Sequence, residues 1–219
     1  MKTQELFVWW ADARAARRYR IENLSADDLR RAQAVRSAKA QGDWRVSRAL
    51  LHEVRAELPP GGATSLSHSG GSAVCAATSA ARPLGADLER IRPREVLRLA
   101  DWVCTPEERG VLAGLDGARQ LQHFYLMWTL KEAFIKAAAL DFPADMASAG
   151  LAAGPDGAWR LRAPPGRWKA CSWRLGDEWI SSVVWDVGTG ESIRPLWRTV
   201  TGCELPAVTV LGEWESGLV

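Results

Sequence analysis

The chain has 219 residues, which is enough for one good hydrophobic core or for two modest cores packed together. Its composition, 47% hydrophobic and 25% charged, is ordinary for a globular protein, and a formal net charge of +2 is too small to argue for nucleic-acid binding by itself. The four cysteines lie far apart with no C-x-x-C pair, which favours free buried thiols in a reducing compartment over a disulfide framework.

The N-terminal region begins with a short apolar run and continues into a basic stretch. Residues 6–10, LFVWW, predict a buried strand, and the run is too short for a signal peptide or a membrane span. We therefore expect a soluble, cytoplasmic protein. The first sixty residues hold twelve Lys and Arg against eight Asp and Glu, which fits either a basic lobe for an anionic partner or a solvated helix face.

Helices and strands are expected in a regular order after this strand. Ser25 is a fair N-cap for a first helix, Gly42 is expected to end it, and LPPGGA ends a second helix that starts at Asp43. The other predicted elements are a hairpin over 65–80, a turn and strand over 82–91, a helix over 95–115 in two pieces that divide at Thr105 and Pro106, the longest helix over 118–139, and strands over 158–163, 167–175 and 178–187.

A weak symmetry runs through this order. A helix followed by a hairpin occurs in the first part of the chain, and the same succession occurs again in the second part. The repetition predicts an α+β protein of two similar halves, residues 1–84 and 85–219, which form one functional unit.

The stretch WTLKEAFIKA, residues 128–137, places charges within an apolar helix. Trp128, Glu132 and Lys136 are four residues apart and line one face, while Lys131 lies about 100° round the helix from Glu132. One interpretation is an ordinary Glu–Lys pair on a solvated face. The flanking aromatic residues favour another, a sheltered glutamate that serves as a base or metal ligand while Lys136 holds an anion.

The stretch GADLE, residues 85–89, carries two carboxylates. If it is a strand, Asp87 and Glu89 project from the same side and repel each other. Either both groups lie at a solvated rim, or they bind a hard cation such as Mg²⁺, for which Glu132 could supply a third carboxylate.

The stretch SLSHSGG, residues 65–71, contains a Ser-His-Ser run. Ser67 and His68 are adjacent on a predicted strand and point to opposite faces, so they cannot form a nucleophile–base pair directly. His68 is better suited to bind an anionic ligand next to small residues, and the alternative is a histidine satisfied within a turn.

These three stretches together resemble one family. SLSHSGGSAVCA, then GADLERI about twenty residues on, then FYLMWTLKEAFIKA about forty beyond, are similar in order and spacing to the motifs of the 4′-phosphopantetheinyl transferases of the surfactin-synthetase-activating type. Those motifs are S-x-S-H-S, G-[IV]-D-[IV]-E and W-[ST]-x-K-E-[AS]-x-x-K. The resemblance covers residues 24–137 well, and it implies a pseudo-dimer of two α+β halves with coenzyme A and Mg²⁺ in the cleft between them.

The resemblance also implies residue roles. Asp87, Glu89 and Glu132 match the Mg²⁺-site acids, and Glu132 also matches the base that deprotonates the acceptor serine. Lys136 is implied in catalysis because it offsets charge on the leaving phosphate. The residues that match contacts to coenzyme A are Ser67, His68, Lys131, Lys136, Arg31 and either Lys39 or Arg45.

The implied reaction is the attack of a carrier-protein serine on the β-phosphate of coenzyme A, which gives a holo-carrier and 3′,5′-ADP. The enzyme would then be a holo-[acyl-carrier-protein] synthase, with Mg²⁺ as its cofactor and coenzyme A as its co-substrate. Its partner would be an acyl or peptidyl carrier of fatty-acid, polyketide or nonribosomal peptide biosynthesis, and its acidic surface would suit the basic N-terminal lobe. The resemblance implies a monomer with no nucleic-acid or membrane partner.

The chain departs from the family pattern at two places. LPPGGAT has no lysine where the family has a G-K-P stretch, and AALDFPADM replaces a Gly-rich turn after the long helix. The missing lysine supports one alternative, a coenzyme A-binding relative that has lost catalysis. The other alternative is a nucleic-acid-binding module built on basic helices and tryptophans, but it gives the three acids no role.

Overall fold

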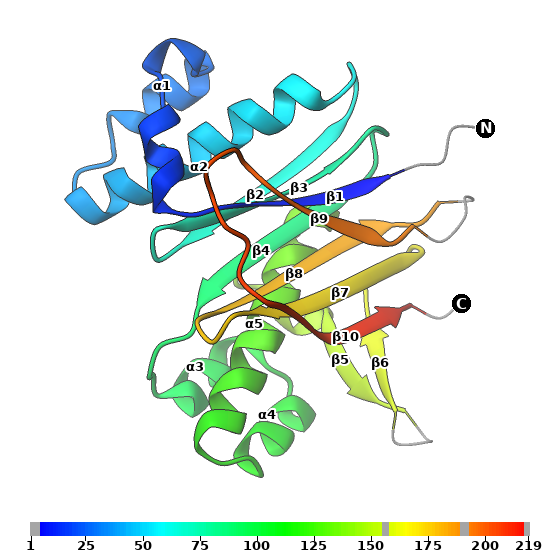
Figure 1. The fold of residues 1–219 in the computed structure, drawn as a ribbon. Coiled ribbons are helices and arrows are strands. Elements are labelled where there is room, and N and C mark those ends of the chain that lie inside the picture. The colour runs from blue at the N-terminus through cyan, green and yellow to red at the C-terminus, as the bar shows by residue number, and fades with distance from the viewer. Residues whose placement is uncertain (1–4, 155–157, 189–192, 217–219) are drawn as a thin grey trace. The chain divides into compact units, whose positions relative to one another are not determined.

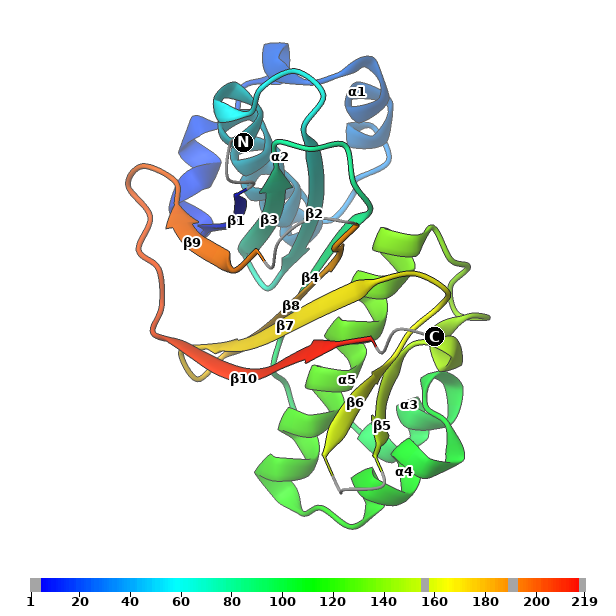
Figure 2. The same cartoon turned by 90° about the vertical axis from the view of Figure 1, so that its right-hand side faces the viewer.

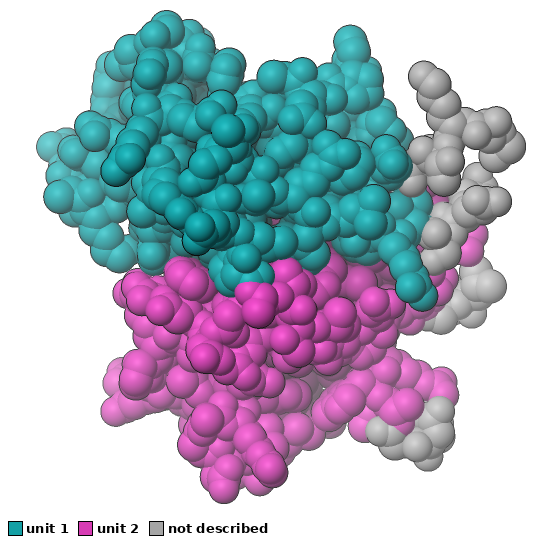
Figure 3. Space-filling model, in the orientation of Figure 1, with its two compact units in different colours: residues 1–81, 193–206 teal, residues 82–192, 207–219 magenta. Residues whose placement is uncertain are grey.

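The computed structural model describes residues 5–154, 158–188 and 193–216. The chain forms two compact units, which are coloured separately in Figure 3. The first contains residues 1–81 and 193–206, and the second contains residues 82–192 and 207–219.

The first unit combines a four-stranded sheet with a long helix packed against it (Figure 1). Its strand order is β2-β3-β1-β9, in which β3 pairs antiparallel with both β2 and β1, and β9 pairs parallel with β1. The elements of the unit are β1 (Leu6–Ala11), η1 (Ala13–Arg18), η2 (Ile21–Asn23), α1 (Ala26–Ala32), α2 (Ala38–Glu57), β2 (Ala63–Ser69), β3 (Ser72–Thr78) and β9 (Pro195–Thr199).

Helix α2 begins earlier than the sequence predicts. The Ser37 hydroxyl accepts a hydrogen bond from the backbone N–H of Ala40, so the helix starts at Ala38 and continues through Gly42. The expectation that Gly42 ends a helix is therefore wrong, because a glycine within a helix costs only about 1 kcal/mol relative to alanine. Leu50 and Val54 are fully buried in the core that α2 forms with β1 and β3.

The predicted hairpin is formed by β2 and β3. The two strands pair from Ala63 opposite Thr78 to Ser69 opposite Ser72. Gly70 and Gly71 connect them with φ angles of 57° and 88°, a left-handed conformation that glycine adopts without a steric penalty. The hairpin tip therefore has a fixed backbone shape just after Ser67 and His68.

The second unit contains an antiparallel sheet of order β10-β7-β8-β4 and a two-stranded sheet, β5-β6 (Figure 2). The elements of the unit are β4 (Leu84–Arg90), α3 (Val96–Val103), α4 (Pro106–Ala113), α5 (Gly117–Ala138), η3 (Met146–Ser148), β5 (Gly150–Ala153), β6 (Trp159–Arg162), β7 (Trp168–Leu175), β8 (Trp179–Asp186) and β10 (Val208–Glu215). The helices α3, α4 and α5 and the strands β4, β6, β7 and β8 confirm the sequence-based elements.

Helix α5 lies directly on β4. A Cβ at Gly85 would overlap the backbone carbonyl of Ala133, so the glycine permits this close approach. One face of α5 buries Leu130 and Phe134 in a core with Trp168 of β7, and the rings of Phe134 and Trp168 meet edge to face with their centroids 5.7 Å apart. The backbone of α5 is thereby fixed in position over the first strand of the unit.

Strand β9 belongs to the first unit, whereas the sequence predicts it in the second half of the chain. The division at residue 84 puts residues 193–206 in the C-terminal half, whereas β9 extends the sheet of the first unit through its pairing with β1. The chain therefore leaves the second unit after β8 and returns to it with β10, which pairs with β7.

All four cysteines lie within the described residues, are buried, and form no disulfide, as the sequence predicts. Burial raises the pKa of the Cys75 thiol to about 12 and that of Cys104 to about 11. None of the helices in the described ranges has the length and apolar character that crossing a membrane requires.

Candidate active site

Strand β4 directs two carboxylates toward α5. Asp87 and Glu89 follow Gly85 at every second residue, so all three belong to the face of the sheet that α5 covers. Asp87 is buried, with an exposure of 5%, and Glu89 is half-buried. The sequence stretch that predicts a pair of acids on one side thus places them beneath the long helix.

Lys136 of α5 binds the nearer of these acids. Its ammonium donates a hydrogen bond to Asp87 Oδ1 at 2.8 Å and another to the backbone carbonyl of Ala86 at 2.9 Å. The Lys136 side chain remains 31% exposed while Asp87 is buried, so the pair lies where the strand meets solvent. A charge-assisted hydrogen bond of this length fixes the ammonium on the strand.

Glu132 lies one turn before Lys136 on the same face of α5. Burial raises the pKa of its carboxyl, and the negative charge of Asp87 raises it further, while Lys136 lowers it. The three side chains are therefore close enough to influence one another's charge. This favours the sheltered glutamate over an ordinary pair on a solvated face, because a solvated carboxylate would show no such burial effect.

A chain of hydroxyl groups supports α5 beside this cluster. Thr129 Oγ1 lies 2.8 Å from Ser182 Oγ, which in turn lies 2.7 Å from Ser172 Oγ, and all three residues are fully buried. Ser182 is directly opposite Asp87 in the pairing of β4 with β8, and Ser181 Oγ donates to the Asp87 carbonyl at 2.8 Å. These bonds fix the helix and the strand that carry the acids in one arrangement.

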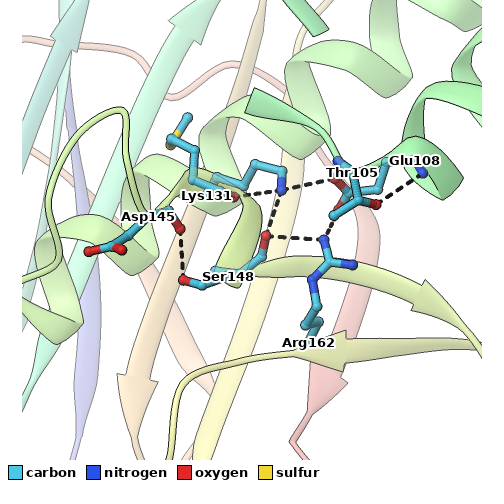
Figure 4. A network of polar contacts seen from close by, with 8 residues as sticks. Thr105, Glu108, Lys131, Asp145, Ser148 and Arg162 are labelled. Carbon is cyan, nitrogen blue, oxygen red and sulfur yellow. Dashed lines mark hydrogen bonds and ion pairs between the residues drawn. The ribbon is translucent and has the colours of Figure 1, made fainter. Parts of the chain in front are cut away.

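Lys131 has different surroundings from those that the resemblance implies. Its side chain is fully buried, and its ammonium binds Glu108 Oε2 at 3.0 Å and the backbone carbonyls of Met146 and Ala149 at 2.8 and 2.6 Å (Figure 4). Burial lowers the pKa of Lys131, although Glu108 opposes this effect. The expectation that this lysine contacts coenzyme phosphates does not match its position, because three protein oxygens already surround its ammonium.

Glu108 is the centre of this second cluster. Arg162 of β6 binds its other oxygen at 2.6 Å, and the backbone N–H of Thr105 donates to Oε2 at 3.0 Å. Gly150, with a φ of 141°, leaves the space that these groups fill, because a Cβ there would overlap the Glu108 carboxylate. Figure 4 shows that the residues come from α4, α5, β6 and the segment before β5, so the cluster joins these elements.

The candidate residues of the first unit divide between two faces of its sheet. Ser67 is buried at 8% exposure, whereas His68 is exposed, and alternation along β2 puts them on opposite sides, as the sequence predicts. Arg31 on α1 and both Lys39 and Arg45 on α2 are exposed. The Lys39 ammonium lies 3.0 Å from Asp43 Oδ2, and the backbone N–H of Gly71 donates to Asp43 Oδ1 at 2.7 Å.

The sequence interpretation missed several of these groups. Within the described ranges, no group of three or more His, Cys, Asp or Glu side chains is placed so that it could hold a metal ion. Glu108 had a detectable signal, because Thr105 and Glu108 have the T-x-x-E spacing of a capping box, and the structure forms that box. The burial of Lys131 and the contacts of Asp43 had no such signal, since both depend on residues distant in sequence.

Comparisons with known proteins find similarity to one family. Residues 83–184 match the model of the 4′-phosphopantetheinyl transferase superfamily. A 4′-phosphopantetheinyl transferase of Bacillus subtilis is 35% identical over 103 residues, which cover 46% of this chain and 44% of that protein. The 4′-phosphopantetheinyl transferase psf-1 of Bacillus pumilus is 34% identical over 99 residues, which cover 45% of this chain and 41% of that protein.

The chain thus spans less than half the length of the curated relatives that it matches. A crystal structure of a holo-(acyl-carrier-protein) synthase from Bacillus anthracis in complex with CoA (3′,5′-ADP) is similar at a TM-score of 0.40 and 20% identity. The similarity covers 48% of this chain and 95% of that one. The matched region contains the β4 acids and the α5 charges, and in residues 83–184 the chain is similar to the 4′-phosphopantetheinyl transferase superfamily.

Proposed function

We propose that the protein transfers 4′-phosphopantetheine from coenzyme A to a serine of an acyl or peptidyl carrier protein, giving the holo-carrier and 3′,5′-ADP. The observation that carries this proposal is the cluster of Asp87, Glu132 and Lys136, in which one carboxylate binds an ammonium and raises the pKa of the other. The cluster lies within residues 83–184, the region that the superfamily model matches.

Glu132 is the proposed base. Its carboxylate would accept the proton of the acceptor serine as the serine oxygen bonds to the β-phosphorus and the bond from that phosphorus to the 3′,5′-ADP oxygen breaks. A carboxylate whose pKa is raised by burial is a stronger proton acceptor than a solvated one. Lys136, oriented by Asp87, would place its ammonium against the phosphate oxygens and offset the charge on the leaving group.

Asp87, Glu89 and Glu132 are the residues that would hold Mg²⁺. The set fits this ion because all three offer the oxygen ligands that Mg²⁺ prefers. It also fits because the charge of Asp87 raises the pKa of Glu132, a repulsion between carboxylates that a divalent cation would relieve. When bound, the ion would neutralise charge on the diphosphate oxygens of coenzyme A.

The nucleotide end of coenzyme A is assigned to the first unit, where His68, Ser67, Arg31 and Lys39 or Arg45 are the candidate contacts. Lys131 would contribute through the fold, because its ammonium binds Glu108 and two carbonyls.

The surface of α3 supports an acidic carrier protein as the partner. Leu97 and Trp102 are exposed at 47% and 76%, and the exposed residues Arg94 and Arg98 lie beside them. Apolar side chains flanked by cations suit a partner that presents an apolar helix face with acidic residues around it.

The test is the incubation of the protein with apo carrier proteins, coenzyme A and Mg²⁺, followed by intact-protein mass spectrometry. We expect a carrier that is heavier by one phosphopantetheine group, and we expect Glu132→Gln to abolish the gain. A Lys169→Gln variant is a matched control, because it removes a charge from β7 without touching the cluster. No gain with any acyl or peptidyl carrier, while a known transferase modifies the same carriers, would favour a coenzyme A-binding relative that has lost catalysis.

A further inference from the structure

We propose that Asp43 is a positioning residue that holds Lys39 and the tip of the β2–β3 hairpin together as one phosphate-binding site. This inference rests on the proposed function, and it assigns the 3′-phosphate of coenzyme A to Lys39 rather than Arg45. It also gives a role to a buried carboxylate that none of the sequence motifs includes.

Asp43 is a buried carboxylate on the side of α2 that faces the sheet. It lies on α2 one turn before Val46 and Ser47, on the stripe that faces the sheet, and only 6% of it is exposed. Burying a carboxylate is costly unless its oxygens find partners. Asp43 has a partner at each oxygen, with the Gly71 N–H at 2.7 Å from Oδ1 and the Lys39 ammonium at 3.0 Å from Oδ2.

The first of these bonds fixes the hairpin tip. Gly71 follows Gly70 in a turn with two positive φ angles, and its N–H points to a carboxylate that lies 28 residues earlier in the chain. A hydrogen bond from a backbone amide to a charged acceptor is stronger than one between neutral groups. Because β2 enters this turn directly, the bond also fixes the end of the strand that carries His68.

His68 lies on the α2 side of the sheet. It alternates with Leu66, which packs against the core beneath α2, and its partner on β3 is Ala73, a member of that core. His68 is itself exposed, so its imidazole lies beyond the edge of the covered core, near the end of the strand. His68 therefore lies on the same face of the sheet as α2, two residues before the turn that Asp43 binds.

Arg45 lies on a different side of the helix. It is two residues after Asp43, which corresponds to a rotation of about 200° round α2, and it is exposed. Lys39 is one turn before Asp43 on the same side, and its side chain is 64% exposed, so an incoming phosphate can reach its ammonium. The geometry thus assigns the phosphate contact to Lys39.

The experiment measures binding without turnover. Isothermal titration with coenzyme A and with dephospho-coenzyme A, in the absence of a carrier, gives the preference for the 3′-phosphate as the ratio of the two dissociation constants. We expect Lys39→Met to reduce this preference by about tenfold or more, the lower bound for a hydrogen bond to a charged group. Arg45→Met tests the other candidate contact, and we expect it to change the preference by less than about twofold.

Asp43→Asn tests the positioning role directly. If Asp43 acted only through its charge, its neutralisation would remove a repulsion and tighten phosphate binding. Positioning predicts the opposite, a weaker 3′-phosphate preference, and little further loss when Asp43→Asn is added to Lys39→Met. Asparagine keeps an oxygen for the Gly71 N–H, so the hairpin is preserved.

Each outcome decides between two ideas. A preference that is unchanged or increased in Asp43→Asn, or an Arg45→Met loss that equals the Lys39→Met loss, would overturn the inference while the proposed function stands. Wild-type protein that fails to bind coenzyme A with Mg²⁺ present would overturn the proposed function, and the positioning role would fall with it.

Discussion

Glu132 combines two properties that conflict. As the proposed base it must be sheltered, and shelter raises its pKa because burial and the neighbouring Asp87 both disfavour the charged form. A group whose folded-state pKa is raised favours the folded state at pH values below its unfolded pKa, and that contribution is lost as the pH rises through the folded pKa. At neutral pH the charged Glu132 therefore costs stability.

We accordingly expect Glu132→Gln to lower turnover by about 10²-fold or more while raising the melting temperature at neutral pH. The gain in stability should shrink as the pH falls into the range where a solvated glutamate is protonated, because both proteins are then neutral at this position. Thermal unfolding in metal-free buffer across this range, alongside the mass-spectrometric assay, measures both effects. A variant that is less stable than wild type at neutral pH would argue that the Glu132 carboxylate stabilises the fold.

Asp87 gives a second, independent test of the same cluster. Since its charge raises the pKa of Glu132, Asp87→Asn should lower that pKa, and it also removes the negative charge that pairs with Lys136 while leaving an amide oxygen as an acceptor. Carbon-detected NMR titration of the glutamate carboxyls in metal-free enzyme, with Glu132→Gln used to identify the resonance, measures the shift. An unchanged titration would mean that Asp87 does not act on Glu132 in solution.

In wild-type enzyme the pKa of Glu132 should depend on Mg²⁺, because a divalent cation relieves the repulsion that raises it. The acidic limb of kcat/KM should therefore lie at a lower pH with saturating Mg²⁺ than with limiting Mg²⁺, because activity requires the deprotonated base. Measuring initial rates against pH at several Mg²⁺ concentrations tests this. A limb that does not move with Mg²⁺ would assign the limiting proton transfer to another group.

At the scale of elements, the buried pair of Lys131 and Glu108 is the connection between α4, α5 and the segment before β5. The two side chains are 0% and 2% exposed, so removing one partner leaves the other charge buried. We expect Lys131→Met to destabilise the protein by about 3–5 kcal/mol, as breaking a buried pair commonly does. Adding Glu108→Gln should not restore this loss, because Glu108 still pairs with Arg162 at 2.6 Å in Lys131→Met and its neutralisation removes that second ion pair as well.

Urea denaturation measures these free energies of unfolding, and Arg109→Ala supplies the control. Arg109 pairs with Asp101 at 2.9 Å on the surface, with the two side chains 41% and 61% exposed, so its loss should cost at most about 1 kcal/mol. Equal losses in the free energy of unfolding for Lys131→Met and Arg109→Ala would show that the buried pair stabilises the protein no more than a surface pair does.

The elements that the sequence predicts well are those with local signals. Ser25 caps α1 and Thr105 caps α4 through their own side chains, and the period of apolar residues fixes α5. The error at Gly42 has a local origin too, because the stronger signal was the cap at Ser37. Within the site, the alternation of Asp87 and Glu89 follows from the strand period alone.

Other features depend on contacts that are distant in sequence. Lys131 and Lys136 are both lysines of one helix, yet one is enclosed by Glu108 and the other reaches Asp87, and only the packing of α4 and β4 distinguishes them. In the sequence Asp43 looks like an ordinary helical residue, and its contact with the hairpin tip, 28 residues later, is visible only in the structure. A pattern of residue types does not contain these distances.

At the scale of the whole molecule, each unit combines a four-stranded sheet with a long helix, as the repeated order of elements predicts. The sequence pattern does not predict how the chain passes between the units. Residues 193–206 follow five strands of the second unit, β4 to β8, but β9 pairs with β1. Trp197 lies opposite Val8, and the Arg198 guanidinium lies 3.7 Å from the centre of the Phe7 ring. The sheet of the first unit is therefore completed by residues that come after most of the second unit in the sequence.

This dependence can be measured by replacing one strand at a time. We expect that a Gly-Ser linker in place of Pro195–Thr199 removes the hydrogen-exchange protection of β1, since the parallel pairing along Leu6–Trp10 is lost, and that it leaves β7 and β8 protected. The matched replacement of Val208–Glu215 should deprotect β7 and spare β1, because β10 pairs with β7. Coenzyme A binding should weaken in the first variant, since the sheet edge it loosens belongs to the unit that carries His68 and Lys39. If both replacements deprotected the same strands, or if β1 stayed protected without β9, the return of the chain to the first unit would not be part of its stable fold.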